Sequence, residues 1–396
     1  MSKYLADNCF LSNGDKRRCV GCEACVQACP KGCIEMELDV CEFAYPKIDR
    51  AQCIDCGRCI EVCPSVYPDE PHRGKYDALC AWSTDDEIRM RSSSGGIFSE
   101  LALLILRKNG AVCGAIYDEK FQVRHVIIES EADLPPLCGS KYVQSSTTGV
   151  YSAIEGILAV GRHVLFTGTP CQVAGLYSYL RGQDTAKLLT CDLICHGVMP
   201  QTIMDMQVEI YARRSGREVK FLNLRSKVEG QGYCVRAVMD DDTVLTEPGG
   251  ESFFFKLFTR SYILRDSCFH CNWARLMRPG DITLGDFWGV EKTHPELADS
   301  RGVSFILVNS DAGREALADA GERVKSASVG VNDSKQNRLH KPSAADIWTP
   351  RFLRSVRCRG LRYTATQYAK DRSLFMKGVR FLHKKVDVVQ KRFLKG

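Results

Sequence analysis

The sequence predicts a mixed α/β protein that begins with a small α+β module and ends in a basic, helical tail. Three observations lead to this prediction. Eight cysteines repeat with one spacing near the N-terminus, and strand-like and helix-like apolar runs alternate from about residue 76 to residue 330. Residues 351–396 then carry 14 Lys and Arg against two Asp. We expect four divisions. Residues 1–70 form the small module, residues 76–155 and 156–330 together form the body, and residues 331–396 form the tail.

The composition is that of a globular protein. Charged residues make up 26% and apolar residues 44% of the 396 residues, which argues against a disordered, collagenous or membrane-spanning chain. The N-terminus has no apolar core of signal-peptide length, and no uncharged apolar run approaches about 18 residues. We therefore expect a cytoplasmic protein, whose 21 cysteines stay reduced and are available for metal or redox chemistry.

The N-terminal cysteines form an internal repeat of 34 residues. Both runs follow the pattern C-x2-C-x2-C-x3-C-P, the spacing of two-cluster bacterial ferredoxins, in which the fourth cysteine of each run binds the other cluster. We therefore expect one 4Fe–4S cluster on Cys19, Cys22, Cys25 and Cys63, and a second on Cys53, Cys56, Cys59 and Cys29. A pair of zinc sites is the alternative, but zinc does not call for this repeated rhythm.

The segments that flank the second run complete the module. Residues 34–49 contain β-forming residues around Pro46 and predict a short hairpin. Residues 64–76 contain three prolines and no periodicity, which is typical of a linker. The first domain is therefore expected to end near residue 70.

The first part of the body begins with a small-residue turn before an apolar helix at 97–107. Such a turn leaves backbone N–H groups free to face an anion, so it could cradle a phosphate or a flavin. An ordinary helix cap is the alternative. Strands are expected at 111–117 and 123–129, a loop at 139–145 and a helix at 150–160.

The sequence of the second part of the body predicts a parallel pair of strands. A strand at 163–168, a helix at 173–180 and a strand at 188–194 would place Cys171 and Cys195 on loops at the carboxyl ends, where α/β sheets bind ligands. Cys268 and Cys271 form a further hook after an expected helix at 253–264. These four thiols could hold a third cubane cluster, and a structural zinc is the alternative.

Five sequence blocks together resemble one known family. Residues 93–99, 139–145, 167–172, 192–197 and 285–289 are similar to the signature blocks of the coenzyme F420 hydrogenase/dehydrogenase beta-subunit family. With its ferredoxin fusion, the chain resembles the input subunit of dehydrogenases that oxidise reduced coenzyme F420, and plant 7-hydroxymethyl chlorophyll a reductase is a relative. The resemblance covers roughly residues 15–330.

The resemblance implies FAD, a 4Fe–4S cluster inside the body, and hydride exchange with coenzyme F420 or another donor. The implied ligands of the internal cluster are Cys171, Cys195, Cys268 and Cys271. The implied flavin-binding residues are Ser93, Ser94, Gly95, Gly96, Ile97, Gly139, Ser140, Lys141, Tyr142, Gln144 and Asp286. Lys141 and His196 are the candidates for electrostatic or proton roles. The alternative for Lys141 is a solvated loop charge, and the alternative for His196 is a histidine bonded to the backbone.

The expected function is electron transfer between a hydride donor and an external acceptor through FAD and 4Fe–4S clusters. A non-catalytic electron-transfer subunit and an iron–sulfur redox protein of polysaccharide biosynthesis are the alternatives. The expected partners are a redox protein or a reduced deazaflavin, with no nucleic acid. The basic tail either packs on the rest of the chain, of which residues 1–350 carry a net charge of −6, or docks on an anionic protein or membrane surface.

Overall fold

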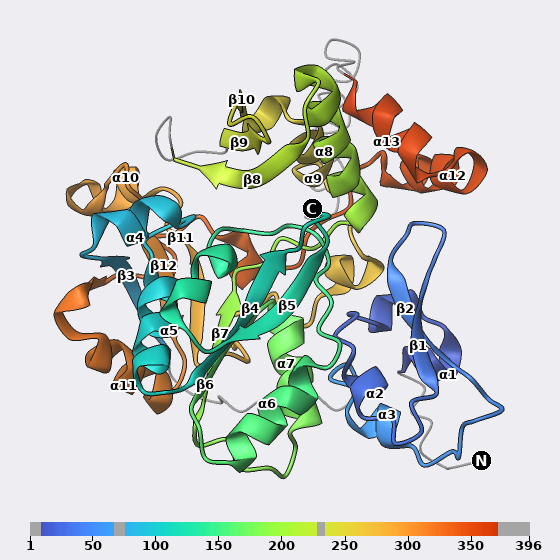
Figure 1. Ribbon diagram of the computed structural model, residues 1–396, viewed down its shortest axis with the longest axis horizontal. Helices are drawn as coiled ribbons and strands as arrows, with labels where there is room; N and C mark the ends of the chain where they lie inside the picture. Colours follow the sequence, from blue (N-terminus) through green and yellow to red (C-terminus); the bar gives the residue numbers. More distant parts are fainter. Residues whose placement is uncertain (1–8, 67–75, 228–233, 371–396) are drawn as a thin grey trace, which may run out of the picture.

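The computed structural model describes residues 9–66, 76–227 and 234–370 (Figure 1). These residues form an eight-stranded mixed sheet, a three-stranded antiparallel sheet and a two-stranded hairpin. The predicted α/β class, with a small α+β module in front, is therefore confirmed. The expected linker falls largely on residues 67–75, which lie outside the described residues.

The N-terminal module consists of three short helices around a hairpin. Its elements are α1 (Phe10–Asn13), α2 (Ala24–Gln27), β1 (Ile34–Leu38), β2 (Ala44–Ile48) and α3 (Arg58–Glu61). The hairpin confirms the prediction for residues 34–49, and Pro46 is tolerated because β2 pairs only with β1. The 34-residue repeat is also structural, since Glu23 and Gly57 both adopt a left-handed conformation just before α2 and α3.

The main sheet has the order β13-β3-β12-β11-β7-β6-β4-β5. Its strands are β3 (Asp77–Ser83), β4 (Ala111–Tyr117), β5 (Val123–Ile128), β6 (Val164–Gly168), β7 (Leu188–Leu193), β11 (Ile282–Asp286), β12 (Ser304–Val308) and β13 (Val324–Ser328). The central strands β4, β6, β7 and β11 run parallel, and the flanking pairs are antiparallel. Strands from the expected regions 76–155 and 156–330 thus pair in one sheet.

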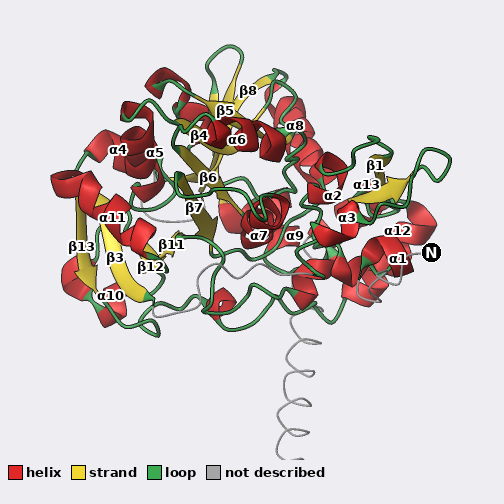
Figure 2. Cartoon of the chain, turned by 90° about the horizontal axis from the view of Figure 1, so that it is seen from below, coloured by secondary structure: helices red, strands yellow, loops and turns green. Residues whose placement is uncertain are grey.

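Helices cover both faces of this sheet, as a parallel core requires. They are α4 (Asp86–Arg91), α5 (Ile97–Arg107), α6 (Val150–Ala159), α7 (Pro170–Tyr179), α10 (Val290–Thr293) and α11 (Asp311–Ala320). Helices α5 and α11 pack together, and α6 and α7 carry Ile154, Val173 and Leu176 into a separate core that also contains Cys22. Figures 1 and 2 both place the N-terminal module beside α7.

A second unit lies above the carboxyl ends of the central strands (Figure 1). It contains α8 (Gln201–Ser215), β8 (Val219–Ser226), β9 (Cys234–Met239), β10 (Val244–Pro248), α9 (Phe253–Phe258), α12 (Thr349–Arg359) and α13 (Leu361–Ala369). These elements share one core, in which Phe352 of α12 stacks on Tyr262. The described part of the basic tail therefore packs on the body, and residues 371–396 lie outside the described residues.

Two expected helix boundaries were wrong. The helix expected at 173–180 begins at Pro170, because Thr169 and Gln172 cap its first turn, so Cys171 lies in that turn and not on a loop. The helix expected at 253–264 ends at Phe258, and Ser261 adopts a left-handed conformation that a continuing helix excludes. Within the described ranges, no helix combines the length and apolar character needed to span a bilayer.

A buried ion pair fixes the end of β7 to the chain that follows the Cys268–Cys271 hook. The Arg278 guanidinium donates two hydrogen bonds to Asp192 Oδ1, at 2.8 and 3.1 Å, and one to the carbonyl of Trp273. The other carboxylate oxygen of Asp192 accepts from the Gly280 N–H at 3.0 Å. Both charged side chains are almost fully shielded from water, so neither charge can be solvated if the other is removed.

We expect Asp192→Asn to lower the free energy of unfolding by about 3–5 kcal/mol, because it leaves the Arg278 charge buried without its counter-ion. Anaerobic urea denaturation measures the change. Arg314→Gln is the control, since Arg314 pairs with Asp77 and Asp311 at the surface and its loss should cost about 1 kcal/mol or less. Equal effects of the two substitutions would contradict the prediction.

Candidate iron–sulfur and cofactor sites

The first set of thiols lines a cavity in the N-terminal module. Cys19, Cys22 and Cys25 of the first run and Cys63 of the second run share this cavity, and Cys29 does not line it. This is the arrangement that crossed ligation requires, although ligation itself stays a prediction. Cys9 and Cys59 also line the cavity, and the sequence analysis had given Cys9 no role.

Three thiols of the second set, those of Cys29, Cys53 and Cys56, do not line this cavity. Burial and the nearby thiols, first Cys9 and then Cys56, Cys29 and Cys53, raise the pKa of Cys59 to about 11. Cys56 is exposed, so this set reaches the surface. Cys33, which had no predicted role, lies with its Sγ 3.4 Å from the Sγ of Cys29.

The third set of thiols lies in the body, at the carboxyl ends of the parallel strands β6 and β7. Cys171 is in the first turn of α7, Cys195 follows β7, and Cys268 and Cys271 lie in and after the 3-10 turn Asp266–His270. Burial raises the pKa of Cys171, and the other three thiols are near enough to raise it further. The tertiary structure thus brings together four thiols separated by up to 100 residues of sequence.

Among the described residues, no three His, Cys, Asp or Glu side chains are grouped as the ligands of a single metal ion would be. Four thiolates that bind different corners of a cubane are spread more widely than four that bind one zinc at about 2.3 Å. Ligation of cubane clusters by the three sets stays a prediction.

The first set rests directly against the body. A Cβ atom at Gly175 of α7 would lie 2.8 Å from Cys22 Cβ and 2.9 Å from Cys22 Sγ, so only glycine permits this approach. The buried Glu23 carboxylate accepts hydrogen bonds from the Thr147 N–H at 3.0 Å and the Thr148 hydroxyl at 2.7 Å. Helix α7 thus carries Cys171 at its start and touches the first set one turn later.

The two loops expected to line a flavin meet in the structure. The Ser140 N–H and hydroxyl both lie 2.9 Å from the Ser93 hydroxyl, which joins the turn before α5 to the 139–145 loop. Gly139 has open space where a Cβ would stand. Gly95 is closely packed: a Cβ there would lie 2.4 Å from the Ala81 carbonyl oxygen, so the fold itself requires glycine at this position.

Several predicted flavin contacts have other partners in the described chain. The Ser94 hydroxyl donates to the Val303 carbonyl, and Ile97 is 1% exposed within the apolar core of α5. Gln144 donates to the Gly21 carbonyl of the N-terminal module at 3.4 Å. Gly96 has φ +90° and begins α5, as the predicted turn requires.

The end of β8 brings two cations to these loops that no sequence motif predicts. Arg225 donates to the Asp286 carboxylate at 2.9 Å and to the Tyr142 hydroxyl at 3.2 Å, so two predicted residues share one guanidinium. Lys227 donates to the backbone carbonyls of Arg89 at 2.6 Å and Ser94 at 2.5 Å. No motif marks them, because β8 is more than 80 residues away from the turn before α5.

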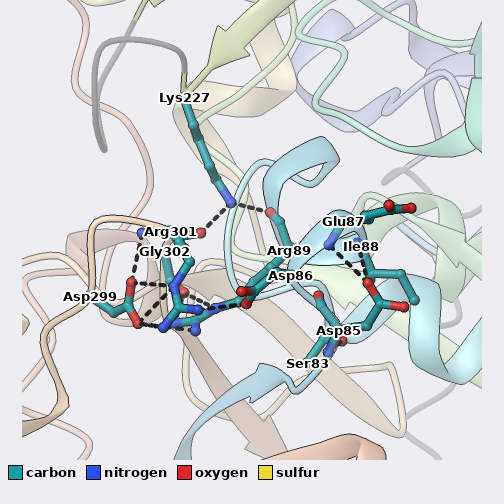
Figure 3. Close-up of polar contacts among 10 residues, drawn as sticks. All are labelled: Ser83, Asp85, Asp86, Glu87, Ile88, Arg89, Lys227, Asp299, Arg301 and Gly302. Carbon is teal, nitrogen blue, oxygen red and sulfur yellow. Dashed lines mark hydrogen bonds and ion pairs between the residues drawn. The ribbon is translucent and has the colours of Figure 1, made fainter.

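Lys227 belongs to a buried polar network that supports the turn before α5 (Figure 3). Besides Arg89 and Ser94, its ammonium group reaches the Arg301 carbonyl at 2.7 Å. The Arg89 guanidinium bonds the Gly302 carbonyl at 2.7 and 3.0 Å and forms an ion pair with Asp299. The network ties β8, α4 and the chain before β12 to one another, so the turn is held from three sides.

The two candidate catalytic residues are both shielded. The Lys141 ammonium donates to the carbonyls of Pro136 and Cys138, and burial lowers its pKa to about 8. The His196 ring lies 3.1 Å from the Ser261 hydroxyl and 4.9 Å from the Phe258 ring, and burial lowers its pKa to about 4. His196 is thus a neutral, packed histidine at neutral pH.

Comparisons with known proteins agree with these groupings. Residues 161–331 match the model for the C terminus of the coenzyme F420 hydrogenase/dehydrogenase beta subunit, and residues 78–151 match the model for its N-terminal part. Residues 18–66 match a 4Fe–4S dicluster domain and residues 48–91 a 4Fe–4S single cluster domain of ferredoxin I. The predicted ferredoxin module is therefore confirmed.

Among the solved structures similar to this chain is the F420-reducing NiFe hydrogenase complex from Methanosarcina barkeri, studied by xenon derivatization. The chains are 20% identical, and the similarity covers 76% of this chain and 93% of the other, with a TM-score of 0.47. No curated protein matches the chain.

We expect Cys63→Ala to damage the cluster of the first run, because Cys63 lines the cavity of Cys19, Cys22 and Cys25. Anaerobic iron analysis and electron paramagnetic resonance (EPR) of the reduced protein should show one of the two module clusters lost or converted. Cys29→Ala is the matched variant and should damage the other cluster. If both substitutions affect the same EPR signal, the crossed assignment is wrong.

Proposed function

This chain belongs to the coenzyme F420 hydrogenase/dehydrogenase beta-subunit family, and we propose that it moves electrons between a hydride donor and an external acceptor through FAD and three 4Fe–4S clusters. The iron–sulfur module and the oxidoreductase family are established by the family matches. Reduced coenzyme F420, or a deazaflavin like it, is the proposed donor. A redox protein is the proposed acceptor or, if electrons flow the other way, the proposed source.

The spatial order of the three thiol sets carries this proposal. Cys171 of the third set and Gly175, which contacts Cys22 of the first set, are four residues apart on α7, or about 6 Å along the helix. The second set shares the module with the first and ends at the exposed Cys56. Electrons could therefore pass from the body to the module surface without crossing solvent, and a partner protein would dock near Cys56.

FAD would lie against the joined loops of Ser93 and Ser140. When bound, it would accept a hydride, which a cubane cluster cannot do, and would release the two electrons one at a time to a cluster. Arg225, fixed by Asp286 and Tyr142, would supply a guanidinium for the anionic groups of the cofactor. The Trp288 ring, 41% exposed, offers a flat surface at the same edge. Lys141 would act as a shielded cation, whereas neutral His196 would only shape the loop after Cys195.

The decisive experiment is an anaerobic preparation in which iron, sulfide and flavin are counted for each chain. Reduced coenzyme F420 and NADH are then added separately. We expect bound flavin and a bleaching of the visible absorbance with reduced coenzyme F420. Clusters without flavin would instead favour the non-catalytic electron-transfer subunit, and full bleaching by NADH alone would contradict the deazaflavin donor.

A second prediction concerns the cluster in the body. Three cubanes contain about 12 irons and two contain about eight, from the four-iron unit. We expect Cys268→Ala to reduce the iron count from about 12 to about eight and to leave both module signals in the EPR spectrum. The control is Cys234→Ala, which removes a buried thiol in β9 of the second unit. If the wild type binds about eight irons and Cys268→Ala loses none, the body has no cluster.

A further inference from the structure

Arg265 extends from the body into the first cysteine loop. It is 1% exposed, the largest side chain among those that are almost completely buried in the described residues. Its Nε donates to the Cys19 carbonyl at 2.8 Å, and its Nη2 lies 3.3 Å from Cys19 Sγ and donates to the Ala44 carbonyl at 2.9 Å. The guanidinium also stacks 4.1 Å from the centre of the Tyr45 ring.

Gly21 makes room for this guanidinium. A Cβ at Gly21 would lie 2.8 Å from Cζ of Arg265, and the φ of +68° also disfavours any other residue there. Arg265 stands three residues before Cys268 of the third set. The side chain therefore links the body thiols to the first module set.

The position is costly for a cation unless an anion compensates it. An arginine side chain keeps its charge in proteins, and its Nη1 is buried without a hydrogen-bond partner among the described residues. The hydrogen bonds of the other two nitrogen atoms go to neutral carbonyls and to the sulfur of Cys19. A cluster with its thiolate ligands, bound at Cys19, would supply the missing negative charge.

The second cluster site differs from the first at the position equivalent to Gly21. In the 34-residue repeat, Asp55 occupies the position of Gly21, and Cys53 occupies that of Cys19. Cys53 Sγ lies 3.7 Å from a carboxylate oxygen of Asp55, which is exposed and paired with Arg50 at 3.5 Å. The first site thus holds a buried cation beside its cysteine, whereas the second holds an acid at the equivalent point.

We propose that Arg265 and Asp55 together set the reduction potential of the first module cluster above that of the second. The first cluster is then the one that exchanges electrons with the body. Reduction adds one negative charge, which a nearby buried cation and an N–H···S hydrogen bond favour and a nearby carboxylate opposes. In this step one electron leaves the body cluster, which is oxidised, and the first module cluster is reduced. The guanidinium keeps its proton.

The direction of this exchange rests on the proposed function, but the order of the two potentials does not. The order of the two potentials is measured by an anaerobic redox titration of the full chain, in which EPR monitors the cluster signals. The signal lost in Cys63→Ala identifies the first cluster.

We expect Arg265→Gln to lower the potential of the first cluster by an amount that changes its reduced-to-oxidised ratio at least tenfold, about 59 mV for one electron. The second cluster should not change. Arg265→Lys, which keeps the charge, should lower the potential less. Arg181→Gln is the matched control, because Arg181 also bonds the module, at the Glu61 carbonyl 3.0 Å away, and should shift neither cluster.

If Arg265→Gln loses its cluster, Asp55→Asn still tests the proposal, because Asp55 is exposed and its replacement should not affect folding. We expect this variant to raise the potential of the second cluster alone. An unchanged first potential in an iron-replete Arg265→Gln protein, or an unchanged second potential in Asp55→Asn, would overturn the proposal. Wild-type protein without two module signals would overturn the proposed function instead.

Discussion

The first cysteine loop rests on helix α7 with no side chain between them, because residue 175 is glycine. That contact turns a ferredoxin module and an α/β body into one continuous structure. A Cβ at this position would come within 2.8 Å of Cys22. The buried Glu23 carboxylate on one side of the contact and Arg265 on the other then fix how the loop lies. The order of the thiol sets from the body to the surface depends on this contact.

Buried charges hold the loops of the body in the same way. Arg225 and Lys227 leave the end of β8 and bind groups in segments distant in the sequence, and Asp192 binds Arg278 beneath the third thiol set. Such charges are costly to bury and are stable only when their hydrogen bonds are complete. They therefore specify one arrangement of the loops, which a cofactor site needs more than it needs additional stability.

The internal repeat shows how one local pattern acquires two environments. The two runs have the same spacing and the same left-handed turns, but the first run packs its cysteine loop on α7 at Gly175 and on the Arg265 guanidinium. Gly21 admits a guanidinium from a distant segment, whereas Asp55 places its own carboxylate next to Cys53 at the surface. Two sites of the same chemistry can then differ in potential because of what surrounds them.

The sequence by itself determined the features that depend on local spacing. The cysteine runs, the hairpin around Pro46 and most strands and helices follow from patterns within a few residues, because ligand geometry and backbone periodicity are local. Only the tertiary structure decided that Cys9 and Cys59 also line the first cavity, and that Gly175, Arg265, Arg225 and Lys227 support the sites. These residues carry no motif, since their partners lie far away in the sequence and their roles arise only when the chain is folded.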